Sequence, residues 1–192
     1  MGAANPLAAA DKIIELARKQ HIKIKVAVVL GDDVFEKISG NETALETNEP
    51  LSKAGELISA NAYLGADALL PALQSDAEII ITGRVADPSL FTAPMIHEFG
   101  WALDDYHKIG QGTVIGHLLE CAGQVTGGYF ADPVKKPVDN LASLGHPFAE
   151  IMPDGVGTIR KVLGTGGIIN LATAKEQLLY EVVNPNEYYT PD

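Results

Sequence analysis

Three residue types that can do chemistry lie close together past the middle of the chain: His117, Glu120 and Cys121. At positions i, i+3 and i+4 of a helix, these side chains would share one face. An imidazole or a carboxyl can move protons when burial brings its pKa toward neutrality, and an ionised thiol is a nucleophile. We expect a helix over residues 113–124 and predict His117, Glu120 and Asp87 as catalytic residues.

Two other interpretations of His117 and Cys121 stay open. The pair could ligate a metal, but two ligands from one helix are too few without others, so no metal site is predicted. Alternatively, Cys121 is a small buried core residue and the imidazole of His117 hydrogen-bonds a backbone carbonyl.

Glycine-rich stretches flank the expected helix and return near the C-terminal end of the chain. Such loops expose backbone N–H groups that can bind a phosphate or an oxyanion. Neither the Walker pattern nor the dinucleotide fingerprint is present, and glycine turns without a ligand are common. The glycines predicted to bind an anionic substrate group are Gly110, Gly112, Gly127, Gly128, Gly164, Gly166 and Gly167.

Polar residues also lie at the ends of three expected strands: Asp32, Asn61 and Arg84. In an open α/β sheet, ligands bind beyond the carboxyl ends of the strands. Arg84 could hold a carboxylate or phosphate with two hydrogen bonds, or it could pair with Asp87 to brace the loop. We predict Arg84 and Asn61 as substrate-binding residues.

Apolar periodicity and turn residues predict alternating helices and strands. The expected helices cover residues 6–19, 66–73, 88–97, 113–124 and 173–181, the last with a Thr173–Glu176 capping box; the expected strands cover residues 22–30, 57–63, 78–82, 148–152 and 157–162. This order predicts an α/β fold with a mostly parallel sheet flanked by helices, as a single domain over residues 1–192. The alternation lacks its first strand, so we expect a fragment of a larger protein.

The composition argues against several classes of partner. The net charge is −11, from 25 acidic and 14 basic side chains, which disfavours nucleic acid and anionic membranes. One cysteine excludes an intramolecular disulfide, and neither a membrane span nor a signal peptide is recognisable. We therefore expect a cytoplasmic protein with a small-molecule substrate, and a homo-oligomer is compatible with the sequence.

Long segments spread over nearly the whole chain match one known family. They are MGAANPLAAA (1–10), GDDV (31–34), NAYLGA (61–66), ITGRVADPSLF (81–91), HEFGW (97–101), GTVIGHLLECAGQVTGGYFADP (112–133), GTGG (164–167) and TAKEQLLYEV (173–182). On these segments the chain resembles the family of the acyclic terpene utilisation protein AtuA. The resemblance implies a link to bacterial breakdown of citronellol- and geraniol-type terpenes through acyl-CoA intermediates. It assigns no catalytic residue and no cofactor, and the family's members extend further at both ends.

Together, these features lead to two functional hypotheses. The first is an enzyme or enzyme subunit that uses acid–base chemistry on an acyl-CoA or a branched organic acid of terpenoid-type catabolism. The second is a non-catalytic ligand-binding or assembly subunit, because the sequence contains no complete triad, metal set or nucleotide fingerprint.

Overall fold

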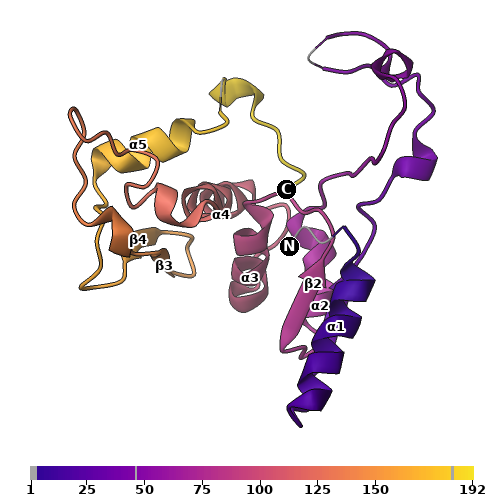
Figure 1. The fold of residues 1–192 in the computed structure, drawn as a ribbon, viewed down its shortest axis with the longest axis horizontal. Helices are drawn as coiled ribbons and strands as arrows, with labels where there is room; N and C mark the ends of the chain where they lie inside the picture. Colours follow the sequence, from indigo (N-terminus) through magenta and orange to yellow (C-terminus); the bar gives the residue numbers. More distant parts are fainter. Residues whose placement is uncertain (1–3, 46, 183) are drawn as a thin grey trace. The chain divides into compact units, whose positions relative to one another are not determined.

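Figure 1 shows the computed structural model, which describes residues 4–45, 47–182 and 184–192. The chain divides into two compact units, the first ending at Val85 and the second beginning at Ala86. Each unit has its own pair of strands. That the two units form a single domain stays a prediction.

The first unit is built on a parallel pair of strands, β1 (Val26–Val29) and β2 (Ile79–Thr82). Helix α1 (Pro6–Lys19) packs against both strands (Figure 1). It begins as expected, because the Asn5 side chain accepts a hydrogen bond from the Ala8 backbone at 3.0 Å and Pro6 occupies the first helical position. A 3₁₀ turn, η3 (Ala66–Leu69), runs into the short helix α2 (Leu70–Leu73) where a helix is expected.

The strand expected over residues 57–63 is wrong. This stretch makes only an isolated antiparallel bridge, between Asp33 and Asn61. Its most apolar residue, Ile58, is 94% exposed, so the segment has no sheet against which a strand could bury a face. The chain before it contains two 3₁₀ turns, η1 (Phe35–Lys37) and η2 (Leu51–Ala54).

The second unit combines helices with an antiparallel hairpin. Its elements are α3 (Ser89–Phe99), α4 (Tyr106–Leu119), η4 (Ala122–Gln124), η5 (Leu141–Ser143), β3 (Pro147–Ile151), β4 (Gly157–Lys161), α5 (Leu171–Leu179) and η6 (Pro185–Glu187). Strands β3 and β4 pair with Phe148 opposite Arg160, so the expected hairpin is confirmed. Helices and strands fit an α/β class, but one parallel and one antiparallel pair do not confirm a mostly parallel sheet.

Helices α3 and α4 pack closely because α4 carries glycine where the two helices meet. A Cβ atom on Gly116 would lie 2.6 Å from the carbonyl oxygen of Pro88. A Cβ on Gly112 would lie 3.0 Å from the Thr92 methyl group and 3.4 Å from the Trp101 ring. These glycines therefore permit the helix contact that supports the C-terminal end of α4.

The start of α4 differs from the prediction. The helix begins at Tyr106 instead of near residue 113, and the Asp105 side chain caps it by accepting from the Lys108 backbone at 3.3 Å. Gly110 and Gly112 consequently lie inside the helix and do not precede it. A good N-cap and the packing on α3 outweigh the low helix propensity of glycine.

Helix α5 also begins differently. Its N-cap is Asn170, whose side chain accepts from the backbone of Ala172 and Thr173, and the Thr173 hydroxyl accepts from the Asn170 backbone at 3.0 Å. The capping box is therefore Asn170–Thr173, and the expected Thr173–Glu176 box is wrong. Thr173 is instead buried inside the first turn.

Candidate functional site

A polar cluster lies at the C-terminal end of α4 in the second unit. His117 is in the last turn of the helix and is 5% exposed. Glu120 keeps helical backbone angles, and its N–H donates to the Gly116 carbonyl at 2.9 Å. The Cys121 thiol donates to Glu120 Oε1 at 2.8 Å.

The pKa of Glu120 is raised above its ordinary value. Burial is the main cause, and the carboxyl groups of Asp87 and Glu181 raise the pKa further, whereas the Cys121 hydrogen bond and His117 lower it. The predicted catalytic residues Asp87 and His117 thus both lie within electrostatic range of Glu120. A carboxyl with a raised pKa is a stronger base than an ordinary glutamate when it is ionised.

Cys121 is a poor nucleophile in this setting. Burial, followed by the hydrogen bond to Glu120, raises the pKa of the thiol to about 12. At neutral pH the group is therefore a neutral thiol that donates to a carboxylate. The geometry favours the interpretation of Cys121 as a half-buried neighbour of the cluster.

The imidazole of His117 has an open hydrogen-bonding position. Within the described part of the chain, its Nε2 is buried and has no hydrogen-bond partner. The Tyr188 ring packs beside the imidazole, with the ring centroids 5.8 Å apart and the planes at 60°. Because buried polar atoms are nearly always hydrogen-bonded, an unpaired Nε2 is a candidate contact for a ligand or a bound water.

Three members of this cluster were not predicted from the sequence: Gln177, Glu181 and Tyr188. Gln177 is 1% exposed, and its amide donates to the His117 carbonyl oxygen at 3.2 Å. Burial raises the pKa of the Tyr188 hydroxyl, and so do Glu120, Glu181 and Asp87, in that order. Thr173 and Gln177 are both buried in the core. Their spacing of four residues puts them on one face of a helix, and this spacing is the sequence signal that could have indicated a buried Gln177.

A second polar arrangement lies at the strand ends of the first unit. The buried Asp32 carboxylate accepts from the Asn61 amide at 2.9 Å and from the Arg84 backbone at 2.7 Å, both at Oδ2. Its Oδ1 lies where a Cβ on Gly83 would be, 1.8 Å away, so only glycine fits there. Asp32 thus brings the predicted binding residues Asn61 and Arg84 together.

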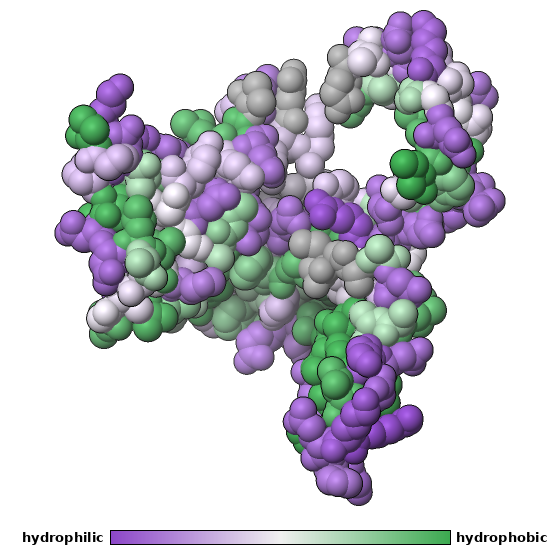
Figure 2. Space-filling model, viewed as in Figure 1, coloured by the Kyte–Doolittle hydropathy of each residue, from purple (hydrophilic) through white to green (hydrophobic). Residues whose placement is uncertain are grey.

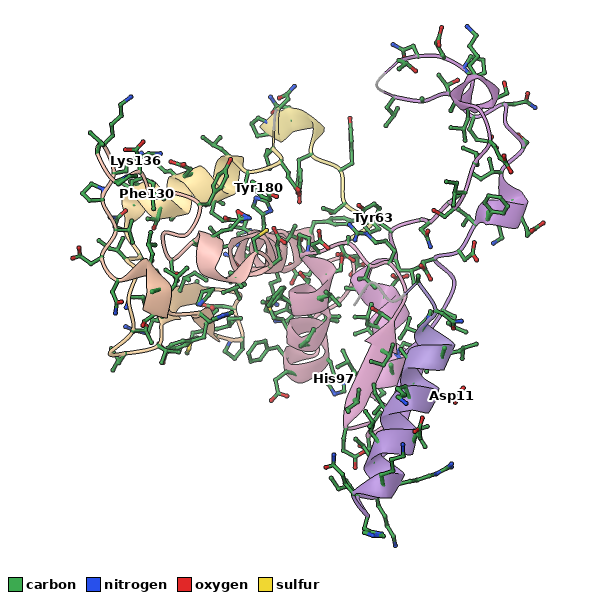
Figure 3. The ribbon with its side chains drawn as sticks, in the orientation of Figure 1. Asp11, Tyr63, His97, Phe130, Lys136 and Tyr180 are labelled. Carbon is green, nitrogen blue, oxygen red and sulfur yellow. The ribbon has the colours of Figure 1, made fainter. Side chains whose placement is uncertain are left out.

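The Arg84 side chain lies against Tyr63, which is labelled in Figure 3. Its Nη2 donates to the Tyr63 hydroxyl at 2.7 Å, and its guanidinium carbon is 4.6 Å from the centre of the tyrosine ring. Stacking and hydrogen bonding fix the orientation of a guanidinium, which favours recognition of a planar anion.

The predicted anion-binding glycines use most of their N–H groups within the protein. In α4, the N–H groups of Gly110 and Gly112 belong to the helix. After α4, Gly127 donates to Gln124 at 3.0 Å and Gly128 donates to Gly123 at 2.9 Å. These bonds favour a structural role, and anion binding at the four positions stays a prediction.

The loop over residues 164–167 is similar. Gly166 donates to the Ser143 carbonyl at 2.8 Å and Gly167 to the Asp139 carbonyl at 2.9 Å. A Cβ on Gly166 would lie 1.9 Å from the Asn140 carbonyl oxygen. Gly164 takes a left-handed turn conformation, with φ of +76°. Close backbone packing explains glycine at positions 166 and 167, and the positive φ explains Gly164, so anion binding at this loop stays a prediction.

Two kinds of feature are absent from the residues that the structure describes. They include no group of three or more His, Cys, Asp or Glu side chains placed to hold a metal ion. They also include no helix with both the length and the apolar character needed to cross a membrane.

Comparison with known proteins gives one positive result. Neither a curated protein nor a solved structure matches the chain. The family described as acyclic terpene utilisation family protein AtuA matches residues 1–192, the whole length of the sequence. The chain therefore belongs to the AtuA family, which is associated with acyclic terpene utilisation.

Proposed function

We propose that this protein is an enzyme, or an enzyme subunit, that moves a proton on an acyl-CoA or a branched organic acid of terpenoid-type catabolism. The observation that carries the proposal is the raised pKa of Glu120, which burial causes, beside a buried His117 imidazole. A carboxyl that titrates closer to neutral pH can both accept and return a proton.

In a dehydration or hydration step, two groups share the proton transfers. The Glu120 carboxylate removes the proton from the carbon next to a carbonyl, and that bond's electrons form the new double bond. The leaving hydroxyl takes a proton from His117 Nε2 and departs as water. Hydration reverses each transfer, so the step needs no oxidant or reductant.

Separately, Arg84 and Asn61, both in the first unit, are proposed to bind an anionic group such as a carboxylate or phosphate. The support is the arrangement around Asp32, which accepts hydrogen bonds from both residues, and the stacking of Arg84 on Tyr63. A guanidinium held in place loses less side-chain entropy when it binds a carboxylate or phosphate. The glycine N–H groups add no support to this part of the proposal.

The first test is ligand binding by thermal shift. Saturable stabilisation is expected with acyl-CoAs or the matching acids, since a ligand at 100 times its Kd adds about 2.7 kcal/mol. The shift should shrink in the Arg84→Ala variant. No stabilisation by any acyl-CoA, free CoA or acid would contradict the proposed substrate class.

The second test measures proton transfer without assuming the net reaction. The protein is incubated with each stabilising ligand in D₂O, and NMR follows deuterium incorporation next to the carbonyl. Glu120→Gln should abolish exchange while ligand binding persists. The exposed Glu98 in α3 offers a matched control, and Glu98→Gln should exchange like the wild type.

The alternative is a ligand-binding or assembly subunit without catalysis. It is favoured by the thiol of Cys121, which is un-ionised at neutral pH and therefore not a ready nucleophile. Arg84-dependent binding with no deuterium exchange in any ligand would replace the enzyme hypothesis with this one.

A further inference from the structure

A groove of about 570 Å³ lies in the second unit, between α4 and the turn of the β3–β4 hairpin. Tyr106, Gly110 and Val114 line it from the helix, and Gly155, Val156 and Gly157 line it from the turn. Figure 2 shows hydrophobic residues gathered over the hairpin. Its volume is within the range of sites that bind small molecules.

The hairpin wall of this groove is fixed by close contacts with α4. A Cβ on Gly155 would lie 2.1 Å from Gln111 Oε1, and a Cβ on Gly157 would lie 2.6 Å from the Ile115 side chain. The Trp101 indole donates to the Pro153 carbonyl at 2.8 Å and ties the turn to the loop between α3 and α4. The groove is therefore preformed, which lowers the entropy cost of binding.

Gly110 has no structural explanation of the kind that accounts for the other glycines of α4. A Cβ at this position would meet no atom within 4 Å, whereas a Cβ on Gly112 or Gly116 would press on α3. Glycine inside a helix is less stable than alanine. The missing side chain at Gly110 leaves the floor of the groove open, so that a ligand can contact the backbone of α4 there.

The groove walls indicate an apolar occupant. Val114 is 49% and Val156 is 56% exposed, which leaves aliphatic surface open to solvent along both walls. No Lys, Arg, Asp or Glu is among the described residues that line the groove. We infer that the groove binds the hydrocarbon chain of a small molecule, laid across Gly110 between the two valines. This inference does not rest on the proposed proton transfer, because it concerns binding alone.

The test uses 1-octanol as the probe and glycerol as a polar control. Methyl NMR on the full chain follows the signals of Val114 and Val156 during the titration. The groove is blocked by Gly110→Leu, since leucine is a good helix former and fills the floor. The control variant is Ala172→Leu, which adds a leucine to the exposed side of α5, away from the groove.

Saturable shifts of both valine methyl signals with octanol, and none with glycerol, are expected. The apparent Kd should rise at least tenfold in Gly110→Leu and stay unchanged in Ala172→Leu. Gly110→Ala should raise the Tm by about 2 to 4 °C in the absence of ligand, because it improves the helix without a clash. If the Tm of Gly110→Leu stays at or above that of the wild type while its octanol affinity falls, misfolding is excluded as the cause of the lost affinity.

Three results would overturn the inference. The first is octanol binding of equal strength in the wild type and in Gly110→Leu, and the second is no saturable shift at either valine. The third is a concentration-dependent dimer that Gly110→Leu dissociates while octanol leaves the methyl signals unmoved, which would make the groove a contact between copies of the chain.

Discussion

Replacing Asp32 is expected to cost far more stability than replacing the adjacent Asp33, although both follow the same strand. The buried Asp32 carboxylate accepts from the Asn61 amide at 2.9 Å and from the Arg84 backbone at 2.7 Å. A hydrogen bond to a charged group contributes about 1.5 to 3 kcal/mol. Loss of both bonds in Asp32→Ala should therefore cost about 3 to 6 kcal/mol, some of it from leaving the two donors without a partner.

The control variant has a much smaller expected effect. The exposed Asp33 side chain makes one hydrogen bond, to the Phe35 backbone at 3.0 Å. Asp33→Ala should cost about 1 kcal/mol, as for an exposed local turn contact. Asp32→Asn should fall between the two alanine variants, because an amide oxygen can still accept where the carboxylate oxygen did, without its charge.

Hydrogen exchange gives the sharpest assay, since it reports on the first unit separately. The N–H of Gly83 donates to the Val29 carbonyl at 3.1 Å, and the N–H of Ala62 donates to the Asp32 carbonyl at 2.7 Å. Their protection should fall roughly a hundredfold or more in Asp32→Ala, the factor that corresponds to about 3 kcal/mol. Equal protection in Asp32→Ala and Asp33→Ala would refute the reasoning that Asp32 organises the strand ends.

Three further predictions concern α4. Gly116→Ala would place a Cβ 2.6 Å from the Pro88 carbonyl oxygen. This variant should lower the free energy of unfolding, measured by chemical denaturation, by about 1 to 3 kcal/mol. An unchanged denaturation midpoint would contradict the close packing of α3 and α4. Cys121 is the only cysteine, and its pKa is about 12. Roughly one thiol in ten thousand is therefore ionised at pH 8. Alkylation of Cys121 by iodoacetamide should be far slower in the folded protein than in the unfolded chain, and it should speed up in Glu120→Gln. The pKa of Glu120 is higher in the folded protein than in the unfolded chain, where it is about 4.5. Ionisation of Glu120 therefore lowers the free energy of unfolding as the pH rises above about 4.5. Glu120→Gln should therefore be more stable than the wild type at pH 7, with a gain that disappears below about pH 4.5; a gain that grows in acid would refute the raised pKa.

The elements that sequence predicts well are those with strong local signals. Asn5 and Pro6 start α1 because a side-chain acceptor and a fixed φ angle act within one turn. The hairpin around Gly155 and the strand β2 are likewise set by residues next to one another in the chain. Glycine misleads in α4, where Gly110 and Gly112 suggest a loop but a cap at Asp105 and packing on α3 extend the helix across them.

The candidate site shows the same division between local and distant signals. His117 and Glu120 are three residues apart, so their proximity follows from helix geometry. Gln177 and Tyr188 reach this cluster from 60 and more residues away. The helical spacing of Thr173 and Gln177 could indicate that Gln177 is buried, but it does not indicate that Gln177 contacts His117. The sequence indicates Asp32 only as a polar residue at a strand end, because its two hydrogen bonds depend on the β1–β2 pairing.

The chemistry at the end of α4 depends on which member of the hydrogen-bonded pair carries the proton. Burial raises the pKa of both Glu120 and Cys121, but the thiol reaches about 12. The thiol therefore stays protonated at any pH at which the carboxyl titrates, and the ionised carboxylate accepts the hydrogen bond from sulfur. Because that bond stabilises the carboxylate, removing it in Cys121→Ala should raise the pKa of Glu120 further. A pH profile of deuterium exchange whose lower limb moves to higher pH in Cys121→Ala would support Glu120 as the proton carrier, and a profile that does not move would assign the limb to another group.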